Sequence, residues 1–222
     1  MKRLTLLFSL CLLTISINAK IEIKKLEPTT WYVGMKDASL QLMAYGDNIR
    51  NAEVSINYPN ARIDSLVRLD SPNYLLIYLN LKDAQAGTMN IDFKLGKQKT
   101  TVKYAWLERT MSGEERKGFD NSDVLYMLMP DRFANGKPDN DSHPALTDKL
   151  NRSDSFGRHG GDIQGIIDHL DYIQSLGATA IWSTPLCEDN EPQHSYHTYA
   201  QTDVYKIDPR YGTNEEYRQL SE

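Results

Sequence analysis

Cysteine, positive charge and phosphate-binding glycine motifs are all scarce in this sequence of 222 residues. The two cysteines are Cys11, in an apolar N-terminal run, and Cys187, so the fold is expected to rest on packing rather than on disulfides. Lys and Arg total 25 against 30 Asp and Glu, and no basic stripe is visible, which argues against nucleic acid as a partner. No Gly-Lys-Ser/Thr and no G-x-G-x-x-G occurs, which argues against a nucleotide site.

No apolar run is long enough to cross a membrane, and the longest one lies at the N-terminus, where it indicates export. Lys2 and Arg3 precede an apolar stretch, residues 4–17, that is too short to anchor the chain in a bilayer. We expect residues 1–19 to be a signal peptide, rather than a buried N-terminal helix, and the exported chain to have no membrane segment. Leu10 stands before Cys11 where a lipobox has a small residue, so a soluble product is favoured over a lipid-anchored one.

What is present is ordinary globular composition, with 40% hydrophobic and 25% charged residues. The length allows one large domain or two small ones, but not a complete (β/α)8 barrel of about 250 residues. The pattern favours two parts, because residues 20–108 differ from residues 123–222, with a polar linker at 109–122 between them.

The first part has the period-two alternation of short strands, punctuated by turn residues. This is typical of an all-β immunoglobulin-like sandwich, although the Cys-Trp-Cys core of antibody domains is missing. The predicted strands are residues 21–23, 39–43, 52–56, 74–81, 89–93 and 101–104.

The second part reads as a β-α-β unit. Residues 124–129 form a continuous apolar run, as expected for a strand buried on both faces of a parallel sheet. Apolar residues at helical spacing predict a helix over 163–176, capped by Asp162 and ended by Gly177, before a strand at 178–182.

A last helix is predicted from the capping-box spacing of Thr213 and Glu216. The chain stops at Glu222, in the second turn of this helix, so we expect the C-terminus to be a truncation.

Two long loops, residues 130–161 and 185–212, leave the carboxyl ends of the two predicted parallel strands, the face that carries active sites in such folds. The first loop gathers oxygen ligands suited to calcium, although turns and helix caps would explain the same residues. These ligand candidates are Asn135, Asp139, Asn140, Asp141 and Asp162.

Other side chains in the second loop favour no definite chemistry. The acids Glu188, Asp189 and Glu191 are expected to be solvated, and His194 lacks metal partners at a recognisable spacing. Cys187 is interpreted as buried or incidental rather than catalytic.

Several motifs then occur in a specific order: residues 130–136, 160–165, 196–199 and 202–213. Together they resemble the α-amylase family of glycoside hydrolases, and the N-terminal sandwich resembles its cyclomaltodextrinase and neopullulanase branch. The resemblance implies that the second part is the start of a (β/α)8 TIM barrel. With the export signal, it points to the periplasmic neopullulanases of starch-utilisation systems, so the periplasm is the expected location.

The resemblance also implies roles for single residues. Tyr199 corresponds to the tyrosine that stacks on the sugar at the cleavage site, and His197 to the histidine that hydrogen-bonds that sugar. Lys137 stands where the branch has a calcium-binding aspartate, and Thr198-Tyr199-Ala200 replaces the more frequent Gly-Tyr-Trp. The implied calcium ligands are Asn135, Asn140, Asp141, the carbonyl of Gly160 and Asp162.

The family's three catalytic carboxylate motifs do not occur before Glu222, so no residue here is nominated as nucleophile or acid. We therefore expect the N-terminal portion of a secreted α-glucan hydrolase, inactive by itself, whose ligands are α-glucan oligosaccharides. The alternatives are a glucan-binding sandwich or one that forms a homodimer. The candidate stacking platforms of the sandwich are Trp31, Tyr32, Tyr74 and Tyr78.

Overall fold

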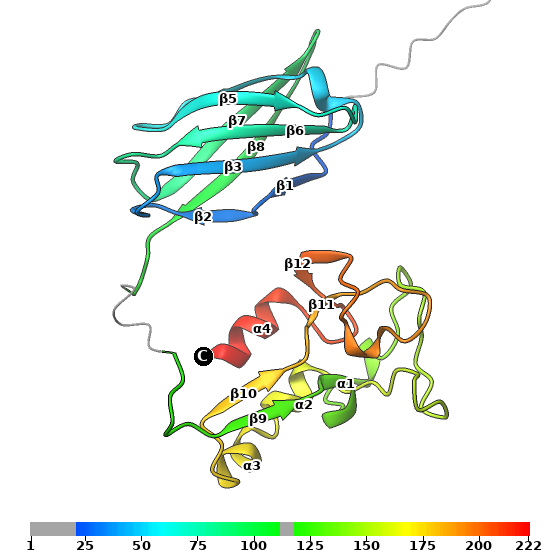
Figure 1. Ribbon diagram of the computed structural model, residues 1–222. Coiled ribbons are helices and arrows are strands. Elements are labelled where there is room, and N and C mark those ends of the chain that lie inside the picture. Colours follow the sequence, from blue (N-terminus) through cyan, green and yellow to red (C-terminus); the bar gives the residue numbers. More distant parts are fainter. Residues whose placement is uncertain (1–20, 112–117) are drawn as a thin grey trace, which may run out of the picture. The chain divides into compact units, whose positions relative to one another are not determined.

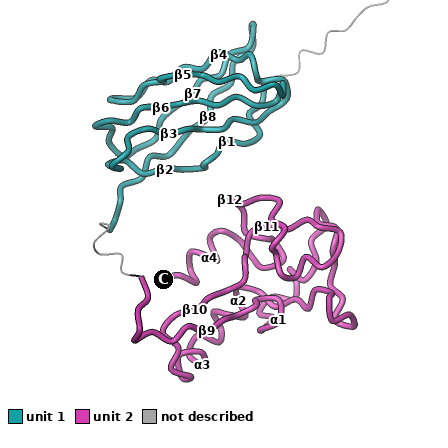
Figure 2. Tube along the Cα trace, viewed as in Figure 1, with its two compact units in different colours: residues 1–112 teal, residues 113–222 magenta. Residues whose placement is uncertain are grey.

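The computed structural model describes residues 21–111 and 118–222, which form two compact units divided between Ser112 and Gly113 (Figures 1 and 2). The division falls within the predicted linker, and the predicted signal peptide lies outside the described residues. Within the two described ranges, no helix combines the length and the apolar character needed to cross a membrane.

Unit 1 is a sandwich of two four-stranded sheets, with strand orders β1-β3-β6-β5 and β2-β8-β7-β4. Neighbouring strands are antiparallel except β2, which pairs with β8 in parallel. The strands are β1 (Lys25–Glu27), β2 (Thr30–Tyr32), β3 (Ser39–Tyr45), β4 (Glu53–Ile56), β5 (Arg62–Arg68), β6 (Tyr74–Asn80), β7 (Gly87–Leu95) and β8 (Gln98–Leu107).

The predicted alternation builds one core between these sheets. Every second residue of β6 is buried, and the inward residues of β3 and β7 meet them. Two aromatic residues of β8, Tyr104 and Trp106, are buried with their rings edge to face at 4.8 Å between centroids.

Three details of the strand prediction are wrong, and the first is that β2 was not expected. No strand covers residues 21–23; β1 begins at Lys25, while Ile21 is buried in the core. Strand β5 was not expected, because a register shift between Ile63 and Ser65 breaks its alternation.

Unit 2 contains the predicted β-α-β unit. Strands β9 (Leu125–Leu128) and β10 (Ala180–Ser183) pair in parallel, from Leu125 opposite Ala180 to Leu128 opposite Ser183. Helices α2 (Ile163–Ile167) and α3 (Leu170–Ser175) supply Ile166 and Ile173 to the core on one face of this sheet.

The predicted continuous helix is interrupted at His169, whose backbone is not helical (φ −120°, ψ 16°). Its ring nitrogen bonds the carbonyl oxygen of Gly165 at 2.8 Å, while its backbone N–H donates to Ile166 instead. The side chain thus replaces the backbone donor that a regular helix would use there.

The expectation that residues 124–129 form a strand buried on both faces is also wrong, because one face of β9 is exposed in the described residues. Met127 and Trp182 lie opposite each other on the face away from the helices, and they are 69% and 65% exposed.

The remaining elements belong to the loops and the C-terminal end. The predicted capping box of the last helix is confirmed, because Thr213 and Glu216 exchange both hydrogen bonds. These elements are η1 (Ile49–Asn51) in unit 1 and, in unit 2, α1 (Pro130–Phe133), η2 (Pro138–Asn140), β11 (Cys187–Glu188), η3 (Ser195–His197), β12 (Asp203–Ile207) and α4 (Asn214–Ser221).

Candidate functional site

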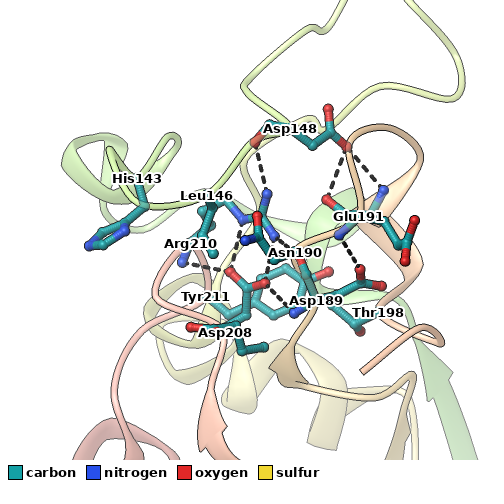
Figure 3. A network of polar contacts seen from close by, with 12 residues as sticks. His143, Leu146, Asp148, Asp189, Asn190, Glu191, Thr198, Asp208, Arg210 and Tyr211 are labelled. Carbon is teal, nitrogen blue, oxygen red and sulfur yellow. Dashed lines mark hydrogen bonds and ion pairs between the residues drawn. The ribbon is translucent and has the colours of Figure 1, made fainter. Parts of the chain in front are cut away.

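A buried ion pair joins the two long loops of unit 2 (Figure 3). The Arg210 guanidinium donates to both carboxylate oxygens of Asp208, at 2.9 and 2.7 Å, and both residues are at most 1% exposed. It also donates to the carbonyl oxygens of Asp148, at 2.8 Å, and Asp189, at 2.5 Å. Since Asp148 lies in the first loop and Asp189 in the second, Arg210 fixes their relative positions.

Burial opposes ionisation of Asp208, but hydrogen bonds from Arg210 and the charges of Arg158 and Arg210 outweigh it. The pKa of the Asp208 carboxyl therefore lies below its usual value. Nearby, burial raises the pKa of the Tyr211 phenol, which donates to the carbonyl oxygen of Tyr196 at 2.5 Å.

The three acids of the second loop do not share one environment. Asp189 is fully buried, and its carboxylate accepts backbone N–H groups of Glu191, at 3.0 Å, and Ala200, at 3.2 Å. Glu188 pairs with Lys206 at 2.5 Å, and only Glu191 is exposed. The expectation that all three are solvated is therefore wrong, and Asp189 holds the loop's backbone.

The segment carrying His197 and Tyr199 is anchored on both sides of those residues. Buried Ser195 donates from N–H and hydroxyl to Asp148, at 3.0 and 2.9 Å. Buried Thr198 donates its hydroxyl to the carbonyl oxygen of Pro185 and has a left-handed backbone, φ 53°. This conformation favours glycine, the residue more frequent here in the family that the motif resembles.

His197 and Tyr199 consequently lie together at the surface, with ring centroids 5.5 Å apart. Tyr199 is 66% exposed and His197 is half-buried. The backbone N–H of Tyr199 donates to Nδ1 of His197 at 3.1 Å, so Nδ1 is the acceptor of the neutral ring. The proton then sits on Nε2, which can donate to a ligand hydroxyl.

A cleft of about 460 Å³ adjoins Tyr199 at the carboxyl end of β10. Its walls include the exposed ring of Trp182 and the side chain of Gln201. The hydroxyl of Thr184, also in its lining, is buried and lacks a hydrogen-bond partner among the described residues. Aromatic faces beside polar donors are the side chains that bind sugars.

Cys187 lines the same cleft, and its thiol is half-buried. Burial raises the pKa of this thiol, and the charge of Asp203 adds to the effect. A raised pKa disfavours the thiolate, which agrees with the interpretation of Cys187 as non-catalytic.

The residues implied as calcium ligands lie in two neighbouring groups. In the first group, Asn135 donates its amide N–H to Asp141 at 2.6 Å, leaving its own amide oxygen buried without a hydrogen-bond partner. The amide oxygen of Asn140 is likewise buried without one. Gly160 has φ 86°, and a Cβ there would lie 2.4 Å from the Asp141 carboxylate.

The pKa of the Asp141 carboxyl is raised, chiefly by burial and further by the charges of Asp162 and Asp131. The hydrogen bond from Asn135 and the charge of Arg152 lower this pKa but do not outweigh burial. Unsatisfied amide oxygens beside such a carboxylate fit a hard cation. Such a site would need amide and backbone oxygens as ligands. In the described residues, no cluster of three or more His, Cys, Asp or Glu side chains is arranged to hold a metal ion.

Asp162, in the second group, serves the backbone. Its carboxylate accepts N–H groups of Gly136, Lys137 and Gly165, at 3.0, 2.8 and 2.6 Å. It therefore caps α2, as predicted, and holds the turn after α1. The ammonium of Lys137 forms an ion pair with Glu216 of the capping box, so its charge is compensated.

Sequence reasoning missed two buried charges that support the first loop. The Asp131 carboxylate accepts N–H groups of His159, at 2.9 Å, and Gly160, at 3.2 Å. Arg158 is fully buried, donates to the Ser195 carbonyl oxygen at 3.0 Å and lies over the Tyr211 ring at 4.8 Å. Asp131 lies in a recognised motif; for Arg158 the sequence carries no signal of burial.

Two family models match the chain: "Cyclomaltodextrinase, N-terminal" over residues 25–110 and "Alpha amylase, catalytic domain" over residues 127–222. The chain belongs to the α-amylase family, in its cyclomaltodextrinase branch. This confirms the resemblance and the expected order of domains, a β-sandwich followed by the start of the catalytic domain. The family is one of glycoside hydrolases.

The relatives are much longer than the part that matches. Neopullulanase 2 of Thermoactinomyces vulgaris is 41% identical over 100 residues, which are 44% of this chain and 16% of the relative. The cyclomaltodextrinase of Thermoanaerobacter pseudethanolicus is 41% identical over 98 residues, again 44% and 16%. The beta/alpha-amylase of Paenibacillus polymyxa is 43% identical over 96 residues, 43% and 8%. The chain thus covers less than a fifth of these relatives.

Among solved structures, a cyclic α-maltosyl-(1→6)-maltose hydrolase from Arthrobacter globiformis, in complex with that sugar, is 36% identical. The match covers 45% of this chain and 21% of that one, with a TM-score of 0.37. A cyclomaltodextrinase is 20% identical over 90% of this chain and 38% of its own, also with a TM-score of 0.37.

Proposed function

We propose that this chain is the N-terminal portion of an exported, periplasmic hydrolase of α-1,4-glucosidic bonds in starch, pullulan or cyclodextrins, acting with retention. The observation that carries the proposal is the pairing of Tyr199 and His197 beside a cleft at the carboxyl end of a parallel strand. Names of family members, such as neopullulanase and cyclomaltodextrinase, support the substrate class. Export rests on the sequence of residues 1–19 alone.

In this proposal the chain binds and orients the sugar. The Tyr199 ring packs against the apolar C–H face of a glucose residue, while Nε2–H of His197 donates to one of its hydroxyls. Two carboxyl groups about 5 Å apart complete retaining hydrolysis, one attacking and one protonating. We assign neither role to a residue of this chain, and we expect the 222 residues alone to bind without cleaving.

Calcium is part of the same proposal. Asn135, Asn140 and Asp141 would hold the ion through side-chain oxygens, with the Gly160 carbonyl beside them; two amide oxygens that lack partners support this assignment. Asp162 would contribute through the backbone it fixes. The ion supplies positive charge that ties the first loop together, and Lys137, paired with Glu216, does not oppose it.

The test is calorimetric titration of the 222-residue chain with maltoheptaose. Tyr199→Ala is expected to weaken binding about 3- to 10-fold, the worth of one aromatic stack. Tyr172→Ala is the matched control, because Tyr172 is 53% exposed on α3, outside the loops that carry the site. Equal affinity of wild type and Tyr199→Ala would contradict the proposal.

A second candidate function is glucan binding by the sandwich. A cleft of about 430 Å³ there is lined by Trp31 and Tyr32, with Lys36, Asp37 and Lys82 as polar neighbours. The other two nominated platforms do not take part in it. Tyr74 packs on Tyr45 at 4.9 Å, and Tyr78 donates to Gln41 at 2.6 Å. A homodimer through this domain stays a prediction.

A further inference from the structure

An exposed phenylalanine, Phe156, lies in the first loop of unit 2. Phe156 is 58% exposed, and the five residues before it, 151–155, are exposed as well. Leaving a large apolar ring in water forgoes the stabilisation that its burial would bring. A single exposed ring needs no explanation, but one that adjoins further aromatic residues is a candidate binding surface.

The backbone under this ring is held in one conformation. Asp154 accepts the N–H of Phe156 at its carboxylate, 2.9 Å, and the N–H of Gly157 at its carbonyl, 3.0 Å. Gly157 is buried so close to the chain that a Cβ there would lie 2.4 Å from the carbonyl oxygen of Asn151. Phe156 is therefore presented on a fixed support, which lowers the entropy cost of binding a ligand.

Phe156 is paired with a residue of the second loop. Its ring centroid lies 5.5 Å from that of His194, at an interplanar angle of 50°. His194 is exposed and has a left-handed backbone, φ 62°, at the start of η3. The same segment carries further ring contacts: the ring centroids of Tyr196 and His197 are 5.1 Å apart, and those of His197 and Tyr199 are 5.5 Å apart.

Arg132 connects the Phe156 segment to this row. Its guanidinium donates to the carbonyl oxygen of Ser155 at 2.9 Å and lies over the Tyr196 ring at 4.2 Å. The side chain thus holds the residue before Phe156 against the segment that ends at Tyr199. The first loop thus meets the aromatic segment of the second at two points, where Phe156 contacts His194 and where Arg132 lies between Ser155 and Tyr196.

We propose that Phe156 and His194 form an outer sugar-stacking platform. When one glucose residue of a linear α-glucan is bound at Tyr199, this platform binds another glucose residue of the same glucan. This inference rests on the proposed function. A glucan suits the surface because each glucose offers an apolar face for a ring and hydroxyls at its rim. Arg152 donates from Nε to the His159 carbonyl oxygen, and one Asp154 carboxylate oxygen accepts the Phe156 N–H. Their remaining guanidinium N–H groups and carboxylate oxygen can serve those hydroxyls, because both residues are exposed. The platform makes the site prefer longer glucans.

The test compares maltotriose and maltoheptaose by calorimetric titration of the full 222-residue chain. Phe156→Ala is expected to weaken maltoheptaose binding about 3- to 10-fold and to change maltotriose binding less than about 2-fold. His194→Asn should act in the same way, because asparagine accepts a left-handed backbone but has no ring. Tyr199→Ala should weaken both ligands, and Tyr172→Ala neither.

The outcomes separate the two proposals. If wild type binds and Tyr199→Ala weakens binding, but Phe156→Ala and His194→Asn leave maltoheptaose binding unchanged, the platform is overturned and the proposed site stands. Equal weakening of both sugars by Phe156→Ala, with unchanged thermal unfolding, also overturns it. If wild type binds neither sugar, the proposed function fails, and the platform fails with it.

Discussion

Arg210 and Asp208 show how single residues hold the candidate site in unit 2. Neither lines the cleft, but Arg210 bonds to backbone carbonyl oxygens of both loops, and the second loop carries His197 and Tyr199. Removing one partner of such a buried pair is strongly destabilising, because the other partner is left as an uncompensated buried charge. The geometry of His197 and Tyr199, the proposed sugar-binding residues, therefore depends on buried charges outside the cleft.

The pH dependence of stability follows from the lowered pKa of Asp208. A carboxyl whose pKa is lower in the folded state stabilises the fold fully above its unfolded value, 3.8, and this stabilisation is lost as pH falls through the folded pKa. Asp208→Asn should remove this dependence and cost about 3–5 kcal/mol at neutral pH, because Arg210 is left buried without its partner. Urea unfolding of unit 2 between pH 2 and 7 measures both effects.

The control for that experiment is Glu215→Gln, which lies in the same unit. Glu215 pairs with Arg218 at 2.5 Å on the exposed face of α4, where solvent screens the interaction. We expect this variant to lose much less stability than Asp208→Asn. An Asp208→Asn variant as stable as the Glu215→Gln variant would show that the buried pair does not hold the loops.

At the residue scale, the sequence predicts a role only where that role depends on neighbouring residues in the chain. His197 and Tyr199 were identified from a motif, and Asp162 as a helix cap from its place before an apolar run. The left-handed backbone of Thr198 and the burial of Arg158 and Asp189 depend on contacts between distant segments. A charged residue in a polar loop carries no local sign that the fold will bury it.

At the scale of elements, local patterns predicted two helix caps, both paired strands of the β-α-β unit and five of the eight sandwich strands, namely β3, β4, β6, β7 and β8. Long-range contacts altered several other details. The helix over 163–176 is broken because the His169 side chain bonds to Gly165 in place of its own N–H. Strand β5 escaped prediction because its register shift hides the alternation. The hairpin of β11 and β12 was missed for a similar reason, since its two partners are short and their register is irregular.

The first loop yields a prediction about calcium. Calcium chloride should raise the unfolding temperature of unit 2, and the gain in stability is about 2.7 kcal/mol when the free ion is at 100 times its Kd. Asp141→Asn should abolish the gain, and a raised pKa of Asp141 means that binding weakens as pH falls, because protons compete with the ion. Differential scanning calorimetry with calcium or a chelator measures this.

Asp171→Asn is the matched control for the calcium experiment, because Asp171 is an exposed carboxylate on α3. Its response to calcium should equal that of the wild type. An unfolding temperature that does not depend on calcium would mean that hydrogen bonds to the backbone, and not a metal, account for the carboxylates of this loop.

At the scale of the whole molecule, the two units carry different candidate sites. Unit 2 has the cleft beside Tyr199 and Trp182, and unit 1 has the cleft beside Trp31 and Tyr32. The change from period-two to helical spacing predicted this division into two parts. Sequence patterns could not say which part binds a sugar, because aromatic residues occur in both.

The three tryptophans decide between the two clefts, since one lies in each and Trp106 is buried in the sandwich core. The measurement is the indole N–H resonances of the ¹⁵N-labelled chain, recorded by NMR during titration with maltoheptaose. The account predicts that the Trp182 signal shifts as the sugar saturates, while the Trp106 signal stays in place. A shift of Trp31 with Trp182 unmoved would contradict it and assign glucan binding to the sandwich.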